Sequence, residues 1–276
     1  MTSGPEITPA IAAGLLDELT KIAGRASAAI LANPAATVAH HAKEDGSPVT
    51  AADEASEAVI LEGCQRILGD VPVVSEEQAA RPAALALRRS FILVDPLDGT
   101  REFLQGRDEF TVNLAIVNGG TPIAGIIAAP ARRWLWRGIV GVCAERLRLH
   151  ADGTADESSP IRTRTWPGPD AIAAVSRSHF DRKTDSLLQR LGVVKRLSAG
   201  SSLKFCCLAE GTADIYPRLS PTCEWDIAAG HAILTAAGGV MTSAQRTPIV
   251  YGNSEKHFRV PDFIAWGDPA QTRAGL

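Results

Sequence analysis

Two aspartates three residues apart, Asp95 and Asp98, stand at the end of an apolar run in the sequence. The run, residues 91–94, contains two β-branched side chains, and this composition predicts a short buried strand. We expect the strand to stop at Asp95, because Pro96 holds the preceding residue extended and has no amide proton for a sheet. Open α/β sheets place ligand sites at the carboxyl ends of their strands. The two carboxylates are therefore candidates for a site at such an edge.

A pair of carboxylates at a strand end suits a hard cation. Mg²⁺ prefers oxygen ligands and binds a few carboxylates together with a substrate phosphate, and one aspartate could bridge two ions. Gly99 allows the backbone to approach a ligand closely, and Thr100 adds a hydroxyl. If a helix or turn begins here, its free amides would face an anion. The alternative is an ordinary turn, since aspartate, proline and glycine all favour turns, and this segment by itself leaves both interpretations open.

Three more acidic residues occupy positions where an element begins or ends. Residues 73–77 predict a second strand that ends in two acidic residues, the first of which is Glu76. Asp226 precedes an Ala- and Gly-rich helical run, so it is either a helix cap or a metal ligand near the positive end of the helix. Thr50 fits an N-cap, and Asp53 three residues later completes a variant of the capping box. By this pattern alone, Asp53 is a cap.

The first half of the chain predicts long helices and an antiparallel sheet. Apolar residues recur at helical spacing in two of its segments, 8–32 and 50–68. Asn118-Gly119-Gly120 separates two apolar runs and predicts a hairpin of residues 110–117 and 122–129, which residues 134–140 continue. Residues 78–90 read as a connector with a short helical piece. These elements form one α+β layer that carries most of the acidic candidates.

The second half predicts alternating strands and helices. A Gly-, Ser- and Pro-rich stretch over residues 151–170 marks a loop or boundary. Beyond it we expect strands at 171–175 and 193–194, a helix over 227–237 ended by two glycines, and a disordered tail after Gly267. The chain therefore divides into residues 1–150 and residues 151–276, as two α/β layers of one continuous unit.

Polar residues of the second half gather at the ends of its expected strands. Ser176 ends one strand and His179 follows it, while Gly200, Ser202 and Lys204 follow the next strand. Hydroxyls and a lysine suit a phosphate, and a histidine there would favour a nucleotide phosphate or ribose. Serine-rich turns before helices are also common caps, so the pattern leaves both interpretations open.

Bulk properties exclude several other classes of protein. The chain has 276 residues, is 45% hydrophobic and can bury a sizeable core. Its net charge of −3 gives no sign of a nucleic-acid surface, no apolar run reaches the roughly 18 residues of a membrane span, and a signal-peptide pattern is lacking. Five cysteines without a C-x-x-C motif argue against a disulfide framework or a zinc site. We expect a cytoplasmic protein, with peripheral contact at the inner membrane face left open.

Three motifs together resemble the inositol monophosphatase superfamily, the lithium-sensitive, Mg²⁺-dependent phosphatases. They are Asp-Pro-Leu-Asp-Gly-Thr-Arg-Glu-Phe at 95–103, Ser-Glu-Glu at 75–77 and Trp-Asp-Ile-Ala-Ala-Gly-His at 225–231. Residues 43–53 look like the family's mobile loop and helix start at the edge of the site. The resemblance extends from about residue 43 to residue 237. It implies an α/β (α+β) fold with α-β-α-β-α layers, the sugar-phosphatase fold that inositol monophosphatase shares with fructose-bisphosphatase.

The resemblance implies a set of metal ligands. A first Mg²⁺ would take Glu76, Asp95 and the backbone carbonyl of Leu97. A second Mg²⁺ would take Asp95, Asp98 and Asp226. Two such ions supply an activated water, charge neutralisation and help for the leaving oxygen in phosphate monoester hydrolysis. Mn²⁺ is an alternative metal.

The resemblance also implies which groups act on the water and the phosphate. Asp53 would face the catalytic water or a third ion. Glu76 and Thr100 would orient the attacking water. The amides of Gly99 and Thr100 would cradle the phosphate, as a nest of N–H groups does. No covalent phosphoenzyme is implied.

Two segments of the second half are similar to the CysQ-type 3′(2′),5′-bisphosphate nucleotidase branch of the superfamily. Ser-Arg-Ser-His at 176–179 and Gly-Ser-Ser-Leu-Lys-Phe-Cys at 200–206 look like the segments that hold the second phosphate of the nucleotide in that branch. Residues 213–218 resemble a family strand that reaches the substrate pocket. The implied substrate contacts are Gly99, Thr100, Ser176, His179, Gly200, Ser202, Lys204, Arg218 and Asp226.

The expected activity is Mg²⁺-dependent hydrolysis of the 3′-phosphate of adenosine 3′,5′-bisphosphate, which gives AMP and phosphate. Phosphoadenylyl sulfate is a second expected substrate, and the role would be to clear a by-product of sulfate activation. One alternative is an inositol 1-phosphate or sugar phosphate monoesterase. Another is a nucleotide-binding regulator without activity. The expected partner is a small nucleotide and not a nucleic acid polymer, and a homodimer is left open.

Overall fold

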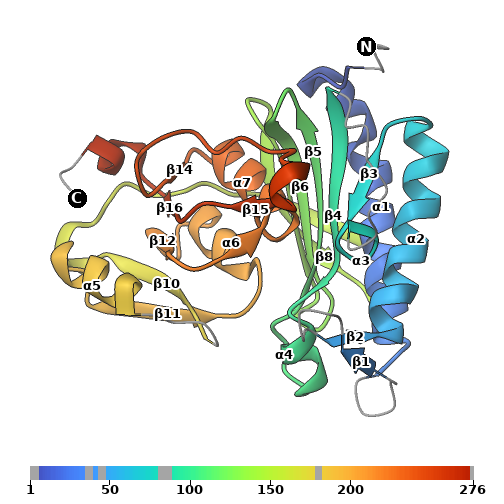
Figure 1. The fold of residues 1–276 in the computed structure, drawn as a ribbon, viewed down its shortest axis with the longest axis horizontal. Coiled ribbons are helices and arrows are strands. Elements are labelled where there is room, and N and C mark those ends of the chain that lie inside the picture. The colour runs from blue at the N-terminus through green and yellow to red at the C-terminus, as the bar shows by residue number, and fades with distance from the viewer. Residues whose placement is uncertain (1–5, 35–39, 43–47, 80–88, 178–181, 274–276) are drawn as a thin grey trace.

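The computed structural model describes residues 6–34, 40–42, 48–79, 89–177 and 182–273. In this part of the chain, a seven-stranded and a five-stranded sheet alternate with layers of helices (Figure 1). Helices α1 (Pro9–Leu31) and α2 (Ala51–Leu68) cover the outer face of the larger sheet. Helices α6 (Leu203–Ala209) and α7 (Glu224–Ala236) lie between the sheets, and α5 (Arg182–Arg190) covers the far face of the smaller one. The predicted α-β-α-β-α layering is confirmed.

The larger sheet has the order β3-β4-β5-β6-β7-β8-β9. Only β3 runs parallel to its neighbour β4, and the other pairs are antiparallel. The elements of this half that are not yet bounded are β1 (His40–Ala42), β2 (Pro48–Thr50), β3 (Val73–Ser75), α3 (Glu76–Ala79), β4 (Ser90–Asp98), α4 (Thr100–Leu104), β5 (Thr111–Asn118), β6 (Thr121–Ala129), β7 (Trp134–Ile139), β8 (Cys143–Leu149) and β9 (Ala155–Pro160).

Strand β4 shows why both faces of this sheet are buried. Successive side chains of a strand point to opposite faces. Phe91 and Leu93 pack in the core that contains α7, while Ile92 and Val94 pack in the core that contains α1 and α2. A run of apolar residues, and not an alternating pattern, is what a strand covered on both faces requires. The carboxyl end of β4 therefore emerges between two packed layers.

The smaller sheet has the order β11-β10-β12-β16-β14 and follows the same logic. Ala173 of β10 packs with α5, while its neighbour Ala174 packs in the core shared with α7. The elements of this half that are not yet bounded are η1 (Gly168–Asp170), β10 (Ile172–Ser176), β11 (Lys195–Ala199), β12 (Ile215–Arg218), β13 (Thr222–Cys223), β14 (Val240–Ser243), η2 (Ser254–Lys256), β15 (Arg259–Val260), β16 (Phe263–Trp266) and η3 (Pro269–Arg273).

Helix α7 is held directly against the larger sheet, which fixes the position of its first turn. A Cβ atom on Gly125 of β6 would lie 2.3 Å from the carbonyl oxygen of Ala229. Glycine at this position is what permits such a close approach of helix and strand. The same helix contacts β4, β5, β6 and β7 (Figure 1).

Strand β4 does not stop at Asp95 as the sequence predicted, but continues through Pro96 to Asp98. Asp95 pairs with Asn113 and Asp98 pairs with Thr111, so three steps along β4 face two steps along β5. This extra residue is a β-bulge, and a proline is tolerated there because it need not donate to the ladder. The bulge also turns the two aspartates to new directions at the end of the strand.

Three other segments also differ from the predictions: residues 193–194, 155–160 and 269–273. Residues 193–194 are not a strand, because Val193 still donates its amide to Leu188 at the end of α5, and β11 begins at Lys195. Within the expected loop 151–170, residues 155–160 form β9 and extend the larger sheet. The tail contains η3 at residues 269–273, where disorder was expected. No helix among the described residues is long and apolar enough to cross a membrane.

Candidate active site

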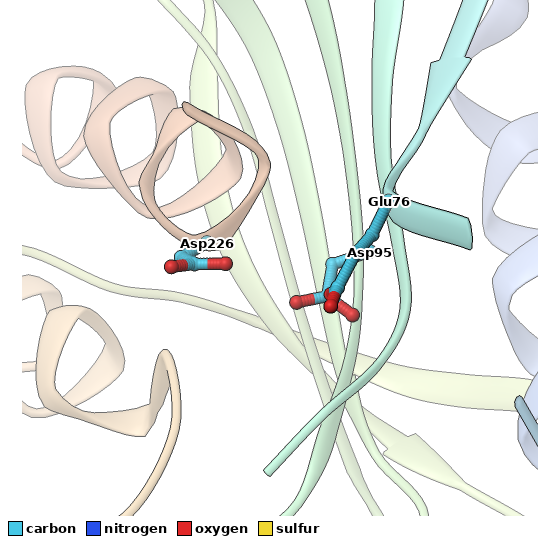
Figure 2. Close-up of side chains that lie close together, drawn as sticks. All are labelled: Glu76, Asp95 and Asp226. Atoms are coloured by element: carbon cyan, nitrogen blue, oxygen red, sulfur yellow. The ribbon is translucent and has the colours of Figure 1, made fainter. Parts of the chain in front are cut away.

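Three carboxylates from distant parts of the chain meet at the carboxyl ends of β3 and β4. Glu76, Asp95 and Asp226 each offer an oxygen, and these oxygens lie within 4.8 Å of one another (Figure 2). Strands β3 and β4 are parallel neighbours, so Glu76 after β3 and Asp95 on β4 emerge at the same edge. Asp226 comes from the first turn of α7, on the opposite side of the group (Figure 2). The arrangement brings together three of the four acidic side chains that the sequence predicted as metal ligands.

Asp95 is at the centre of this group and is 1% exposed. The amide of Leu97 donates to its Oδ1 at 3.1 Å. Burial, and the nearby charges of Glu76, Asp98 and Asp226, raise the pKa of Asp95 well above its usual range. Buried carboxylates that repel one another are stabilised by a cation between them, so this donor set fits a hard divalent metal.

Asp98 lies next to the group and is oriented from the second half of the chain. The hydroxyl of Ser201 donates to Asp98 Oδ2 at 2.6 Å, and the amide of Asn113 donates to the same oxygen at 3.4 Å. Burial and the charge of Asp226 raise the pKa of Asp98 to about 6. Oδ2 of Asp98 accepts both hydrogen bonds, and Oδ1 accepts neither of them.

Asp53 forms the predicted cap and also touches the end of β4. Its Oδ2 accepts from the amide of Thr50 at 2.8 Å and from the hydroxyl of Thr50 at 2.6 Å, which completes a capping box. Its Oδ1 accepts from the hydroxyl of Thr100 at 3.3 Å. The Thr100 hydroxyl also lies 3.1 Å from the carbonyl oxygen of Leu97, which could accept its proton instead. The cap thus connects α2 to the turn that follows Asp98.

Asp226 is held by a second cap of the same kind. Its Oδ2 accepts from the amide of Cys223 at 2.9 Å and from the hydroxyl of Thr222. The predicted helix at 227–237 therefore begins earlier, at Glu224, with Cys223 as the N-cap. The carboxylate of Glu224, two residues before Asp226, accepts from the backbone amides of residues 252 and 253.

The predicted phosphate contacts of the 200–204 segment are largely engaged within the protein. Ser202 is 2% exposed, and its hydroxyl donates to Asn113 Oδ1 at 2.7 Å. Lys204 is equally buried, and its ammonium donates to the carbonyl oxygens of Ala199 and Ser201. Burial lowers the pKa of Lys204 to about 8. The amide of Gly200 donates to a carboxylate oxygen of Glu109 at 3.1 Å.

Two further predicted contacts, Ser176 and Arg218, lie at the ends of strands β10 and β12. Ser176 ends β10 and is paired with Ala199 of β11, close to the same turn. Arg218 ends β12, and its guanidinium donates to the carbonyl oxygens of residues 220 and 221, in the loop that leads to Asp226. His179 lies outside the described residues. His231, the last residue of the 225–231 motif, bonds through Nδ1 to the hydroxyl of Tyr251 at 2.9 Å.

Sequence reasoning missed the buried polar residues that connect the two halves. Thr111 and Asn113 of β5 are at most 1% exposed, and their side chains meet the hydroxyls of Ser201 and Ser202. The sequence did carry a signal for them, because Thr111 and Asn113 are polar residues at alternate positions of a largely apolar strand. Alternate positions of a strand lie on the same face of its sheet. Glu109 was also missed, and it carries no local sequence signal of its role.

Comparisons with known proteins agree with this geometry. Residues 14–262 match the inositol monophosphatase family. The chain is 39% identical over 254 residues to the 3′(2′),5′-bisphosphate nucleotidase CysQ of Salmonella typhimurium, covering 90% of this chain and 98% of that protein. It is 38% identical, with the same coverage, to the CysQ of Escherichia coli strain K12.

Solved structures give the same result. CysQ from Bacteroides thetaiotaomicron, a bacterial member of the inositol monophosphatase family, superposes with a TM-score of 0.74 at 32% identity, over 93% of this chain and 97% of that one. An inositol monophosphatase from Zymomonas mobilis superposes with a TM-score of 0.73 at 26% identity, over 94% of each chain. The chain therefore belongs to the inositol monophosphatase family.

Proposed function

We propose that the protein is a Mg²⁺-dependent phosphatase that removes the 3′-phosphate of adenosine 3′,5′-bisphosphate and releases AMP. The observation that carries the proposal is the hydrogen bond from Ser201 to Asp98. It brings the segment that resembles the nucleotidase branch into contact with the carboxylate group. The identity of 38–39% to proteins named 3′(2′),5′-bisphosphate nucleotidase supports the same substrate class.

The carboxylates fit the metal that this activity needs. Inositol monophosphatase-family proteins are metal-dependent, typically on Mg²⁺. We assign Glu76, Asp95, Asp98 and Asp226 to hold two ions, together with the carbonyl oxygen of Leu97, and leave Mn²⁺ as an alternative. Bound Mg²⁺ supplies charge neutralisation on the phosphate and lowers the pKa of a water. Burial and the charges of neighbouring carboxylates raise the pKa values of Asp95, Asp98 and Asp226, and a bound cation would offset both effects, which supports the assignment.

The residues around the metal ligands are assigned to the water and the phosphate. We assign Thr100 and Glu76 to orient the attacking water. The Thr100 hydroxyl reaches Asp53 Oδ1 at 3.3 Å, so a proton that it receives can be held by that carboxylate. Asp53 is also the candidate for a third ion. The amides of Gly99 and Thr100 are assigned to the transferred phosphate.

The second phosphate of the nucleotide is assigned to the ends of the smaller sheet. Arg218 and Ser176 lie at the ends of β12 and β10 and are candidates for direct contact, together with His179. Gly200, Ser202 and Lys204 are assigned a supporting part, because their polar atoms already bond within the protein, to Glu109, Asn113 and the carbonyl oxygen of Ala199. Phosphoadenylyl sulfate fits the same assignment, with a role after sulfate activation. A cytoplasmic location and a homodimer belong to the proposal without support from geometry.

The test is phosphate release with Mg²⁺ from adenosine 3′,5′-bisphosphate, adenosine 3′-monophosphate and inositol 1-phosphate at equal concentrations. We expect the bisphosphate to be hydrolysed best, because only it carries the second phosphate. Hydrolysis of the 3′-monophosphate at the same kcat/KM would contradict the assigned second-phosphate contacts. A preference for inositol 1-phosphate would be consistent with the assigned metal site and would overturn the proposed substrate.

A further inference from the structure

Glu109 lies between the two glycine turns that carry the site. It precedes β5 and is 4% exposed. A Cβ atom on Gly99, after Asp98, would lie 3.1 Å from the carbonyl oxygen of Glu109. A Cβ atom on Gly200 would lie 2.9 Å from both the carbonyl oxygen and the Cβ of Glu109. One glycine turn from each half of the chain therefore packs directly against Glu109.

The carboxylate of Glu109 accepts four hydrogen bonds. Arg177 donates to both oxygens, from Nε at 2.7 Å and from Nη2 at 2.9 Å. Arg132 Nη2 donates to Oε1 at 3.0 Å, and the amide of Gly200 donates to Oε2 at 3.1 Å. The hydrogen bonds and charge of Arg177 lower the pKa of Glu109, so the group is ionised. A buried, paired carboxylate gives little net stability over an apolar side chain. Stability alone therefore does not account for a glutamate at position 109.

Ser201, the residue after Gly200 in the 200–202 turn, offers a functional account of Glu109. Ser201 has a φ of 53°, a conformation that a serine adopts only when its surroundings hold it there. In this conformation its hydroxyl reaches Asp98 Oδ2 at 2.6 Å. The next residue, Ser202, is fixed to Asn113 of the larger sheet. Glu109 anchors the other end of the turn through the amide of Gly200.

We propose that Glu109 is a positioning residue for metal binding. Its carboxylate holds the 200–202 turn so that Ser201 fixes one oxygen of Asp98, which leaves the other oxygen of Asp98 available to the divalent cation. Partners of ligating carboxylates typically change metal affinity 10–100-fold. The inference rests on the proposed function for the role of Asp98 as a ligand.

The test is Glu109→Gln, measured with Mg²⁺ alone. A glutamine has one acceptor oxygen, and its amide group would face the donors of Arg177 and Gly200. We expect the Mg²⁺ midpoint, which is the Mg²⁺ concentration at half-saturation in a calorimetric titration at fixed temperature, to increase about tenfold. The matched control is Glu145→Gln on β8, which breaks another glutamate–arginine pair, with Arg137 Nε at 3.0 Å, and leaves the Mg²⁺ midpoint unchanged.

A double-mutant cycle with Ser201→Ala separates positioning from general structural support. If Glu109 acts through Ser201, Glu109→Gln shifts the Mg²⁺ midpoint less than about twofold in the Ser201→Ala background. Equal shifts in both backgrounds overturn the proposal. So does a lower melting temperature of the metal-free protein with an unchanged Mg²⁺ midpoint. If Glu109→Gln does not fold, Arg177→Met removes two of the four hydrogen bonds and is measured in the same cycle.

The Mg²⁺ titration contains no substrate, so it is independent of the nucleotidase assay. A wild-type protein that does not hydrolyse adenosine 3′,5′-bisphosphate, but shows the coupling, overturns the proposed substrate and leaves the inference intact. A wild-type protein whose melting temperature does not respond to Mg²⁺ overturns both.

Discussion

Two helices of this protein begin with the same cap, one in each half of the chain. Asp53 in α2 and Asp226 in α7 both occupy the third helical position, and each accepts from the amide of its N-cap residue, at 2.8 Å from Thr50 and at 2.9 Å from Cys223. Each also accepts from a threonine hydroxyl, of Thr50 and of Thr222. In both cases these bonds use Oδ2, so the cap fixes the direction of the remaining oxygen.

The surroundings of that second oxygen differ. Asp53 Oδ1 meets the hydroxyl of Thr100, a donor that satisfies a carboxylate without a cation. Asp226 instead faces Glu76 and Asp95, and its burial and the charge of Glu76 raise its pKa. The same local motif thus supplies one carboxylate suited to receive a proton and another whose acidic neighbours suit a metal ion. Two single substitutions and one pair of substitutions test this contrast.

Replacement of Asp226 by asparagine gives the largest expected effect. Asparagine keeps an oxygen for the cap but removes one charge from the carboxylate group. We expect phosphate release to fall by more than about a hundredfold, since even residues outside the ligand set change activity 10–100-fold. The melting temperature without metal should rise, because a repulsion is removed, and its response to Mg²⁺ should vanish. A variant whose melting temperature still rises fully with Mg²⁺ would show that Asp226 is not a ligand.

Asp53→Asn is expected to lower activity while Mg²⁺ binding changes little. The loss of a positioned base typically costs about a hundredfold or more in rate, and here the proton acceptor beside Thr100 is removed. The measurement is kcat at saturating Mg²⁺ together with the Mg²⁺ midpoint of the calorimetric titration. If Asp53→Asn also lost its response to Mg²⁺, as expected for Asp226→Asn, Asp53 would be a ligand of the same importance, and the contrast between the caps would be lost.

The sequence could predict the caps but not this contrast. Local spacing identified Thr50 and Asp53 as a capping box, and motif resemblance identified Asp226. Where the second oxygen of each aspartate points depends on which strands and turns are its neighbours. That information comes from tertiary packing, and the family resemblance supplied it only as an expectation. Apolar runs and turn residues are local signals and predicted many of the helices and strands, whereas the α-β-α-β-α order of the layers was implied by the family resemblance.

The polar residues between the halves show where prediction from sequence fails. Thr111 and Asn113 are ordinary strand residues until the turn with Ser201 and Ser202 is placed opposite them, 90 residues away in one case. Glu109 is one of many acidic residues, and only its four hydrogen bonds distinguish it. The β4 bulge was missed because a proline usually ends a strand, and a bulge is the exception that a single sequence does not reveal.

The two threonines of the caps provide a matched pair with smaller effects. Thr50→Val removes an N-cap hydroxyl and should cost about 1 kcal/mol of unfolding free energy, with the Mg²⁺ midpoint unchanged. Thr222→Val removes a hydroxyl from a carboxylate assigned to the metal and should raise the Mg²⁺ midpoint about tenfold. Chemical denaturation and Mg²⁺ titration of both variants give the comparison. Equal Mg²⁺ responses would mean that the caps serve only the helices.

The smallest expected effect concerns the stability of the metal-free protein between about pH 4 and pH 6.5. The pKa of Asp98 is raised from 3.8 to about 6, so the stability it contributes is present at low pH and lost as pH rises through 6. Burial lowers the pKa of His231 from 6.5 to about 4, so its contribution is full above pH 6.5 and lost as pH falls toward 4. The two contributions therefore oppose each other across nearly the same range.

His231→Gln removes one of the two opposing contributions and should expose the other. We expect the metal-free variant to lose stability with rising pH more steeply than the wild type, by at most about 1.4 kcal/mol per pH unit. Denaturation at intervals across this range with a chelator present measures the slope. Tyr251→Phe is the control, because it removes the hydrogen bond of His231 but keeps the titrating ring. Parallel curves for the wild type and His231→Gln would mean that the buried histidine does not oppose the carboxylates, and that their repulsion alone sets the pH dependence.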